Sequence, residues 1–283
     1  MNESRGIHAE SEIATTRDTL VIIPTYRHPE CLPLAIASAQ NQTVGDIDIV
    51  VVGDGVADDT RDAIAPILAG DDRVRFLDLP KAIRHGEEYR DAVIRGSAAS
   101  VITYLGDDDL FFPHHIETMR ECISGVDFAN PLPVFINAQR RVYYIAGDLA
   151  DPDSIAWHLD ARRPRNSVSL TGATHTRESY LRLPHGWRPA PVGRWTDHYM
   201  WEQYFQLQGF TARTSRLATT AKFATVGREG MTGAERAMEN QATAARMAQA
   251  GFRAEWDDLI SEVIRVTAVR SLLRMSSLED MRG

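Results

Sequence analysis

The sequence has little cysteine, no excess of basic residues and no long apolar run. Its 283 residues include two cysteines, Cys31 and Cys122, which lie far apart and lack the spacing of metal ligands. We therefore expect reduced thiols in a cytoplasmic protein. The formal net charge is −8, and a chain without a basic surplus is a poor candidate for binding nucleic acid.

No stretch approaches the ~18 consecutive apolar residues that a membrane-spanning helix needs. The first 18 residues are polar and have no apolar core, so we expect no signal peptide there. Hydrophobic residues make up 43% of the chain and charged residues 25%, which is ordinary for a globular protein with a sizeable core. The length suits one large domain or two smaller ones.

What the sequence does have is a regular alternation of short β-branched runs and helical patterns. This alternation is typical of βαβ units, so it predicts an α/β fold with a mostly parallel sheet flanked by helices. The apolar runs are almost continuous, as expected for strands that are covered on both faces. The predicted strands are 19–23, 47–52, 74–79 and 100–105, and the predicted helices are 29–42, 58–68, 87–98 and 113–123.

The second half is less regular, and its last fifty residues are helical in pattern. We divide the chain into a flexible leader (1–17), two halves of one α/β domain (18–125 and 126–230) and a C-terminal helical segment (231–283). Within the second half we expect one or two strands at 134–145, a strand and turn at 167–176, a helix at 194–209 capped by Thr196, a strand at 219–226 and a glycine-rich loop at 227–233.

Polar residues follow three of the predicted strands. Residues 24–27 follow the first strand, Asp54 follows the second, and Asp107, Asp108 and Asp109 follow the fourth. Because parallel strands end at the same edge of a sheet, these residues should meet at one ligand site.

The three consecutive aspartates raise the question of what offsets their mutual repulsion. A hard divalent cation such as Mg²⁺ or Mn²⁺ would do so, and it would bring a phosphorylated ligand with it. A solvated turn before a helix is the other reading. The role of Asp54 is also open between ligand binding and an ordinary turn, because Asp-Gly is a common turn pair. Arg90 is either a bidentate phosphate ligand or part of a solvated helix face.

Five short blocks, in order, resemble the successive motifs of family 2 glycosyltransferases with a GT-A fold. The resemblance covers about residues 18–125 and extends more weakly to about 210. The blocks are IIPTYR (22–27), SAQNQT (38–43), VVGDG (51–55), HGEEYRD (85–91) and TYLGDDDLFFP (103–113). Two positions depart from the family: Asp91 stands where the family has Asn, and Gly106 where it often has an acid.

The resemblance implies an enzyme that takes a sugar from a nucleotide-diphosphate donor and inverts the anomeric centre, with Mn²⁺ or Mg²⁺ as cofactor. UDP and dTDP are the favoured donor nucleotides. Asp108 and Asp109 would hold the metal, with His198 placed beside them. The residues assigned to the donor nucleotide are Pro24, Thr25, Tyr26, Arg27, Asp54, Arg84, Arg90 and Asp107.

An inverting transfer also needs a general base near the acceptor hydroxyl. The family places an acid at the start of a helix in its second half, and Asp197 matches that position, with Thr196 in place of the family's Glu. An aspartate in a first helical turn is also normal without a catalytic role. Arg228, in the glycine-rich loop, is a candidate for a closing lid, and Trp187 and Trp195 are candidates for the acceptor pocket.

The helical pattern at 256–273 has a broad apolar face. Its polar face mixes acidic and basic residues, so packing on the domain or on a second subunit as a homodimer is favoured over a membrane surface. The sequence leaves the identity of the acceptor open: it is a glycan, a lipid-linked intermediate or a small molecule. A cytoplasmic location is expected, and attachment at the inner membrane face stays open.

Two other functions stay open on these residues. A sugar-nucleotide nucleotidyltransferase would also use an α/β sheet and Mg²⁺, but it normally has a glycine-rich loop after the first strand, where this chain has PTYRHPEC. A non-catalytic nucleotide-binding module would keep Asp54 and the three aspartates but would need no general base.

Overall fold

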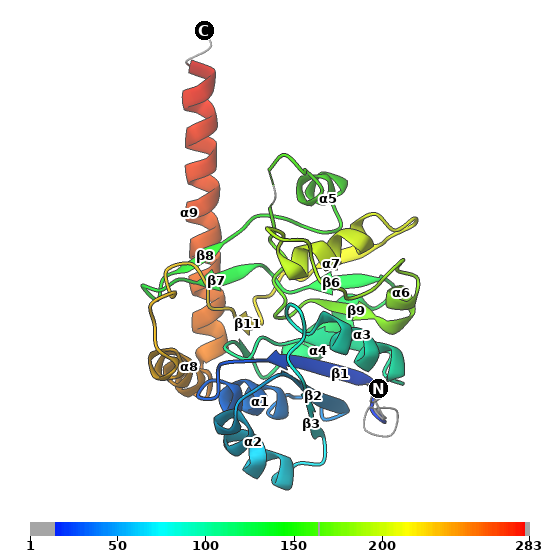
Figure 1. The fold of residues 1–283 in the computed structure, drawn as a ribbon. Helices are drawn as coiled ribbons and strands as arrows, with labels where there is room; N and C mark the ends of the chain where they lie inside the picture. The colour runs from blue at the N-terminus through cyan, green and yellow to red at the C-terminus, as the bar shows by residue number, and fades with distance from the viewer. Residues whose placement is uncertain (1–14, 164, 281–283) are drawn as a thin grey trace.

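The computed structural model describes residues 15–163 and 165–280, with side chains as far as Arg270. A seven-stranded sheet with the order β10-β6-β9-β4-β1-β2-β3 lies at its centre (Figure 1). The first four strands are parallel to one another: β1 (Thr19–Thr25), β2 (Ile47–Asp54), β3 (Val74–Leu79) and β4 (Val101–Tyr104).

A helix follows each of these four strands and returns the chain for the next parallel strand or for the second half. β2 is buried along its whole length, which is why its sequence IDIVVVGD is almost continuously apolar. The helices are α1 (Leu32–Gln40), α2 (Asp58–Gly70), α3 (Glu87–Gly96) and α4 (His115–Ile123).

Alternate residues of each strand pack on opposite faces of the sheet. Val21 and Ile23 of β1 pack in one cluster with α1 and α2. Leu20 and Ile22 pack in another cluster with α3 and with two helices of the second half, α6 (Arg177–Leu181) and α7 (Thr196–Phe205). The period of two along the strand therefore produces the two covered faces.

The second half continues the same sheet. β6 (Phe128–Asn130) and β9 (Thr174–Thr176) are antiparallel to each other, β9 is antiparallel to β4, and β10 (Ala212–Thr214) is parallel to β6. The two predicted halves thus share one sheet. Outside it lie a short helix, α5 (Pro152–His158), and two small two-stranded sheets: β7 (Val134–Ile136) with β8 (Val142–Tyr144), and β5 (Leu110–Phe111) with β11 (Thr220–Ala221).

Two helices close the described chain. α8 (Gly233–Met247) begins with a capping box between Thr232 and Glu235. α9 (Phe252–Asp280) packs its first turns into a cluster with the β7–β8 hairpin and then extends beyond the body (Figure 1). No helix among the described residues is both long and apolar enough to cross a bilayer.

The strand and helix pattern of the first half is confirmed, and so are the helical C-terminal residues that the structure describes. The structure differs at 15–17, which belonged to the predicted leader. Thr16 and Arg17 donate backbone N–H groups to Asp48, and Arg17 pairs with the same carboxylate. Residues 1–14 lie outside the described part. Thr196 does not cap α7, because the capping position is Trp195.

Candidate active site

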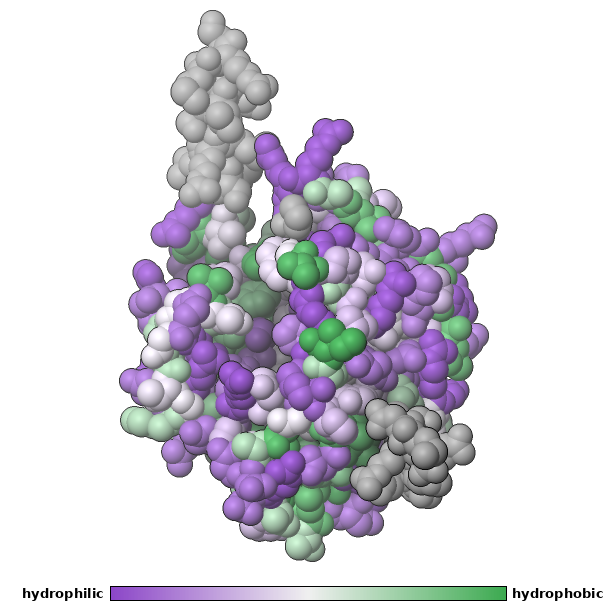
Figure 2. Space-filling model, viewed as in Figure 1, coloured by the Kyte–Doolittle hydropathy of each residue, from purple (hydrophilic) through white to green (hydrophobic). Residues whose placement is uncertain are grey.

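A cavity of about 430 Å³ opens where β1, β2 and β4 end. The face of the molecule in Figure 2 is mostly hydrophilic and is hollowed near its centre. His28, Lys81 and His85 line the cavity, and none of them was assigned to a ligand from the sequence, although His85 begins one of the five sequence blocks. Seven of the eight residues predicted to hold a donor nucleotide also line it: Pro24, Thr25, Tyr26, Arg27, Asp54, Arg84 and Asp107.

Asp54 is held in place by two donors from the loop after β3. The Lys81 ammonium lies 2.5 Å from Oδ2, and the Ala82 backbone N–H lies 2.6 Å from Oδ1. Lys81 also lies 4.9 Å from the centre of the Tyr26 ring. Lys81 therefore fixes the Asp54 carboxylate and the aromatic wall of the cavity together.

Asp107 is also part of the cavity wall. The Thr25 hydroxyl donates to its Oδ2 at 2.7 Å, and the His28 Nδ1 lies 2.9 Å from its Oδ1. The end of β1 therefore contacts the end of β4 directly, as expected for neighbouring parallel strands.

Asp108 has its cationic partners on one oxygen. Arg228 and Arg236 lie 3.2 and 3.3 Å from its Oδ2, and the Asn240 amide donates to its backbone carbonyl. Burial raises the pKa of Asp108, but the surrounding cations, Lys222 foremost, outweigh burial and hold the pKa below its ordinary value. The repulsion within the acidic triplet is thus offset by basic side chains from the last part of the chain.

Asp109 was predicted to bind the metal, and the structure contradicts this. Its Oδ1 accepts the Phe223 backbone N–H at 2.9 Å. Its Oδ2 accepts the Thr171 hydroxyl and lies 2.9 Å from the Lys222 ammonium. Because both oxygens are occupied in the interior, Asp109 serves to join β5 to the second half.

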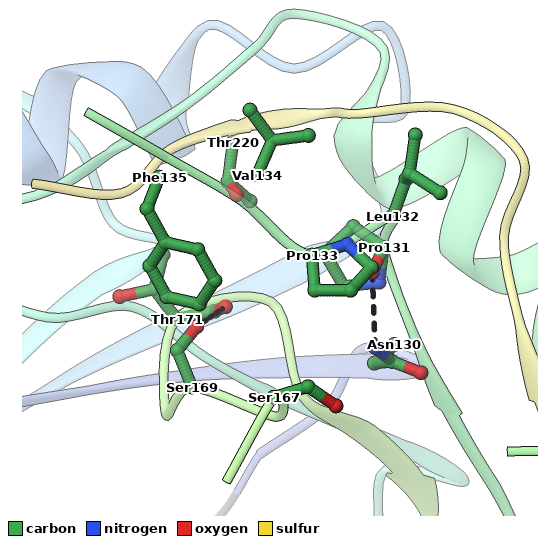
Figure 3. Close-up of a pocket in the computed structure, with 10 residues that line it drawn as sticks. All are labelled: Asn130, Pro131, Leu132, Pro133, Val134, Phe135, Ser167, Ser169, Thr171 and Thr220. Carbon is green, nitrogen blue, oxygen red and sulfur yellow. Dashed lines mark hydrogen bonds between the residues drawn. The ribbon is translucent and has the colours of Figure 1, made fainter. Parts of the chain in front are cut away.

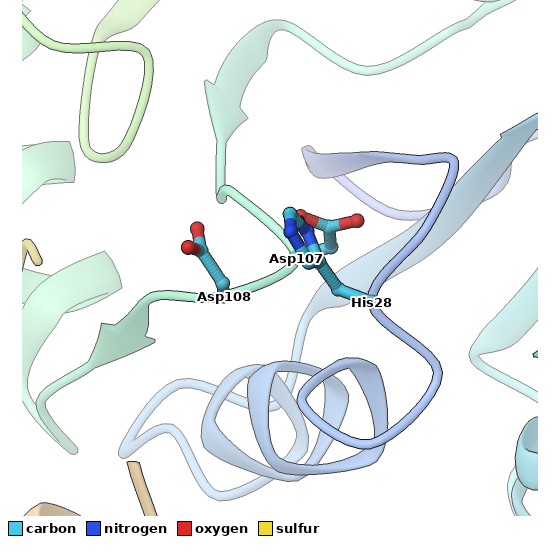
Figure 4. A group of neighbouring side chains, drawn as sticks. All are labelled: His28, Asp107 and Asp108. Carbon is cyan, nitrogen blue, oxygen red and sulfur yellow. The ribbon is translucent and has the colours of Figure 1, made fainter. Parts of the chain in front are cut away.

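His28, Asp107 and Asp108 form a group with metal-ligand spacing (Figure 4). One ligand atom from each lies within 4.8 Å of the others. Two carboxylates and an imidazole suit a hard or borderline divalent cation, so these residues fit Mn²⁺ or Mg²⁺. The hydrogen bond with Asp107 raises the pKa of His28 above 6.5, so protons compete with a cation for this side chain.

His198, placed with the metal ligands from sequence, lies elsewhere. It is buried, its Nε2 lies 2.9 Å from the backbone carbonyl of His158, and its Nδ1 faces Glu202. It therefore anchors α7 to α5. The sequence signal for His28 was its position three residues after the first strand's Thr25, at the edge where ligands bind.

Gly106 departs from the family pattern for a steric reason. A Cβ at this position would lie 2.8 Å from Asp109 Oδ2 and 3.1 Å from the Thr171 hydroxyl. The Gly106 backbone N–H also donates to that hydroxyl. The acid that the family often has here would therefore require the Asp109 carboxylate to shift.

Asp197 lies in the first turn of α7 and is partly buried. Its Oδ1 accepts the His198 backbone N–H at 2.8 Å, and its Oδ2 accepts the Asn166 amide at 3.3 Å. Burial raises the pKa of Asp197 above its ordinary value of 3.8, and nearby Lys222 opposes this in part. The Lys222 ammonium that pairs with Asp109 thus also acts on the pKa of Asp197.

Two residues predicted to face a ligand belong to the core instead. Arg90 is 3% exposed, and its guanidinium lies 4.1 Å from the centre of the Trp187 ring. Trp187 is 2% exposed and donates its indole N–H to Tyr104. Arg90 also donates to the backbone carbonyl of His85, so it supports the cavity wall from the core, and Trp187 is not a pocket residue. The pattern of a helix cannot distinguish a buried arginine from a phosphate-binding one.

The other two acceptor or lid candidates differ from each other. Trp195 is 54% exposed, at the entrance to α7. Arg228 is fully buried, held by Asp108 and by Glu239 of α8. The glycine-rich loop in this structure therefore lies closed on the acidic motif.

A much smaller cavity, of about 10 Å³, lies beside Thr171 (Figure 3). Hydroxyls of Ser167, Ser169 and Thr220 and the chain after Asn130 border it. It has room for about one water molecule. The larger cavity at the strand ends is thus the better candidate for a substrate.

The comparison with known families decides the classification. The family model for glycosyl transferase family 2 matches residues 20–166. The chain belongs to this family. The family resemblance of the sequence blocks is thereby confirmed.

Two curated relatives match at similar levels. One is the GalNAc(5)-diNAcBac-PP-undecaprenol beta-1,3-glucosyltransferase of Campylobacter jejuni subsp. jejuni, 28% identical over 102 residues, or 36% of this chain. The other is an uncharacterized glycosyltransferase of Nostoc sp., 30% identical over 111 residues, or 38% of this chain. The matches span about a third of the length of each relative, 33% in both cases.

Solved structures of S. aureus TarS share the fold of this family member. One crystal structure of TarS superposes on this chain with a TM-score of 0.56 at 14% identity, and the match covers 87% of this chain and 43% of that one. The complex of TarS 1-349 with UDP-GlcNAc gives a TM-score of 0.54 at 14% identity and covers 87% and 71%. The expected α/β fold with a mostly parallel sheet, of GT-A type, is confirmed.

Proposed function

We propose that this chain is a metal-dependent, inverting glycosyltransferase that moves a sugar from a nucleotide-diphosphate donor to an acceptor hydroxyl. The observation that carries the proposal is the cavity at the ends of β1, β2 and β4. Asp54 lies in its wall, Asp107 joins it to the acidic motif, and His28 with Asp108 completes a group suited to a cation.

Asp197 is the proposed general base. Its carboxylate takes the proton of the acceptor hydroxyl while that oxygen attacks the anomeric carbon. The bond between the anomeric carbon and the diphosphate oxygen breaks, and the nucleotide diphosphate leaves. The raised pKa of Asp197 supports this role, because a base is more effective as its pKa approaches the working pH.

Positive side chains surround the place where the diphosphate would lie. Lys222, Arg228 and Arg236 all contact the acidic motif. A cation held by His28, Asp107 and Asp108 would offset the charge that develops on the departing diphosphate. We propose that Arg228 and Arg236 turn from Asp108 to the diphosphate when the cation and the donor nucleotide are both bound.

UDP is the proposed donor nucleotide, with dTDP as the alternative that the sequence left open. The TarS complexes with UDP and with UDP-GlcNAc support UDP, because those proteins share this fold. The name of the Campylobacter relative supports a lipid-linked acceptor. We also propose a cytoplasmic location, at the inner membrane face if the acceptor is lipid-linked. A homodimer through α9 stays a prediction.

The nucleotidyltransferase alternative is weakened by the chain after β1, which lacks a glycine-rich loop and instead turns Thr25 and His28 onto Asp107. The non-catalytic alternative does not explain why Asp197 is held in a desolvated position near Lys222, and family membership favours an enzyme.

The proposal is tested by nucleotide release from a panel of UDP- and dTDP-hexoses, with Mn²⁺ and with excess EDTA. Water serves as a slow acceptor when the natural acceptor is absent. We expect UDP release from one sugar nucleotide only when the divalent cation is present. Pyrophosphate release from UTP and a sugar phosphate, without UDP release, would show a nucleotidyltransferase instead.

A further inference from the structure

A second cavity, of about 170 Å³, lies between the β7–β8 hairpin, α8 and α9. Phe223 forms part of its wall. The backbone N–H of the same residue donates to Asp109 Oδ1 at 2.9 Å. Glu239, also in the wall, pairs with Arg228, which contacts Asp108. The cavity is therefore a direct neighbour of the acidic motif and is separate from the nucleotide cavity.

The lining combines aromatic rings with two free cations. Phe223, Phe252 and Trp256 supply the apolar part, and Arg140 and Arg246 supply the charge. Both arginines are exposed, and neither guanidinium group has a hydrogen bond or ion pair with any other residue that the structure describes. A guanidinium pairs best with a carboxylate or a phosphate, so the cavity presents sites for an anion beside an apolar surface.

Trp256 carries an unused donor at this place. The residue is 5% exposed, and its indole Nε1 has no partner among the described residues. A buried indole N–H usually finds an acceptor, and leaving it without one costs free energy. The nitrogen itself is closed off from solvent, so in this structure the open part of the cavity is lined by other atoms of Trp256.

Arg140 occupies a backbone conformation that favours glycine. Its φ is 58°, and it is the one non-glycine residue of the described chain with a positive φ. It lies in the turn of the β7–β8 hairpin, where its N–H donates to the Asn137 carbonyl. A side chain in the left-handed region costs free energy that glycine avoids, so the turn alone does not account for an arginine here.

We propose that this cavity binds a phosphate or diphosphate carried on an apolar chain. Arg140 and Arg246 would hold the anion, and the aromatic rings of Phe223, Phe252 and Trp256 would cover the first carbons of the chain. Within the proposed function, this group is the part of the acceptor that is not glycosylated. That last step rests on the proposed function, whereas binding itself does not.

The test is a titration of the full chain with farnesyl phosphate, kept below its micelle-forming concentration, by calorimetry. Farnesol and inorganic phosphate are titrated separately as the two components. We expect saturable 1:1 binding of farnesyl phosphate, and binding at least about tenfold weaker for each component alone. The double variant Arg140→Gln/Arg246→Gln should weaken farnesyl phosphate binding about tenfold or more, since each tenfold corresponds to about one charge-assisted hydrogen bond.

Two further variants separate binding from folding. Arg253→Gln/Arg270→Gln removes the same charge from exposed positions of α9 that do not line the cavity and should bind farnesyl phosphate as the wild type does. Arg140→Gly removes one cation but suits the turn, so it should weaken binding while the thermal midpoint changes little.

The proposal is overturned if farnesol binds as well as farnesyl phosphate, if both double variants weaken binding equally, or if association appears only above the micelle-forming concentration. Competition between farnesyl phosphate and UDP would also contradict it, because it would place the anion in the nucleotide cavity. If UDP does not bind but farnesyl phosphate does, the proposed function fails and this site stands.

Discussion

Replacing Asp197 with asparagine should lower the rate of sugar transfer by about 10²–10⁴-fold, the range that a positioned general base contributes. Asparagine keeps the shape of the side chain and one acceptor oxygen, which can still accept the His198 N–H, whereas its NH2 group replaces the oxygen that accepts the Asn166 amide. It cannot take the proton of the acceptor hydroxyl. Donor affinity should be unchanged, because Asp197 does not line the nucleotide cavity. Steady-state kcat and the Kd for UDP, measured on the same preparation, check both expectations.

If Asp197 is the base, kcat should change with pH in a defined direction. The carboxylate is the active form, so kcat should be high above the pKa of Asp197 and fall as the pH drops through it. Burial raises this pKa, so the fall should begin above the usual range of an aspartate. Burial also makes the ionised form costly in the folded state, so Asp197→Asn should be no less stable than the wild type at neutral pH.

Asp153→Asn is the matched control for Asp197, because Asp153 is an exposed aspartate in the first turn of another helix, α5. It changes the same charge at the same position relative to a helix dipole. Its kcat should equal that of the wild type. Wild-type turnover by Asp197→Asn would rule out Asp197 as the base. An equal loss of kcat in both variants would show that removing a charge from a helix N-terminus lowers kcat, without a role for Asp197 in proton transfer.

Replacing Asp108 with asparagine should lower kcat by about 10²-fold or more and should abolish its response to Mn²⁺. Asp108 is the acid of the triplet with only one oxygen engaged by side chains, whereas both oxygens of Asp109 are occupied. Losing its charge removes one of three candidate ligands and the carboxylate that Arg228 and Arg236 share, although Arg228 keeps Glu239. Turnover against Mn²⁺ concentration measures the effect.

Asp72→Asn, at a side chain that is 89% exposed, is the control for this second variant. Because Arg228 is fully buried, the folded state of Asp108→Asn should be verified from its thermal midpoint before activity is compared. Wild-type activity with an unchanged Mn²⁺ response in Asp108→Asn would show that the acidic motif does not bind the cation.

The first half of the fold was predictable because its signals are local. The apolar runs of β1, β2 and β4 are strong, and the parallel arrangement that they imply brings Thr25, Asp54 and Asp107 to one edge. Short strands such as β6 and β10, three residues each, carry no such signal, because their pairing is decided by contacts across the sheet.

The parts of the site that were missed come from contacts between distant segments. Arg236 reaches Asp108 from 128 positions away, and Lys81 reaches Asp54 across the turn after β3. Arg90 and His198 were assigned to ligands because Arg and His bind phosphate and metal. Their burial against Trp187 and the His158 carbonyl is set by packing, which residue type alone does not reveal.

The most direct test of a metal-dependent donor site is a calorimetric titration of the wild-type chain with UDP, in Mn²⁺ and in EDTA. We expect 1:1 binding that Mn²⁺ strengthens by about tenfold or more, since the cation would link the diphosphate to His28, Asp107 and Asp108. Equal affinity in EDTA would contradict metal dependence. The absence of UDP and dTDP binding under both conditions would contradict the assignment of the strand-end cavity to a donor nucleotide.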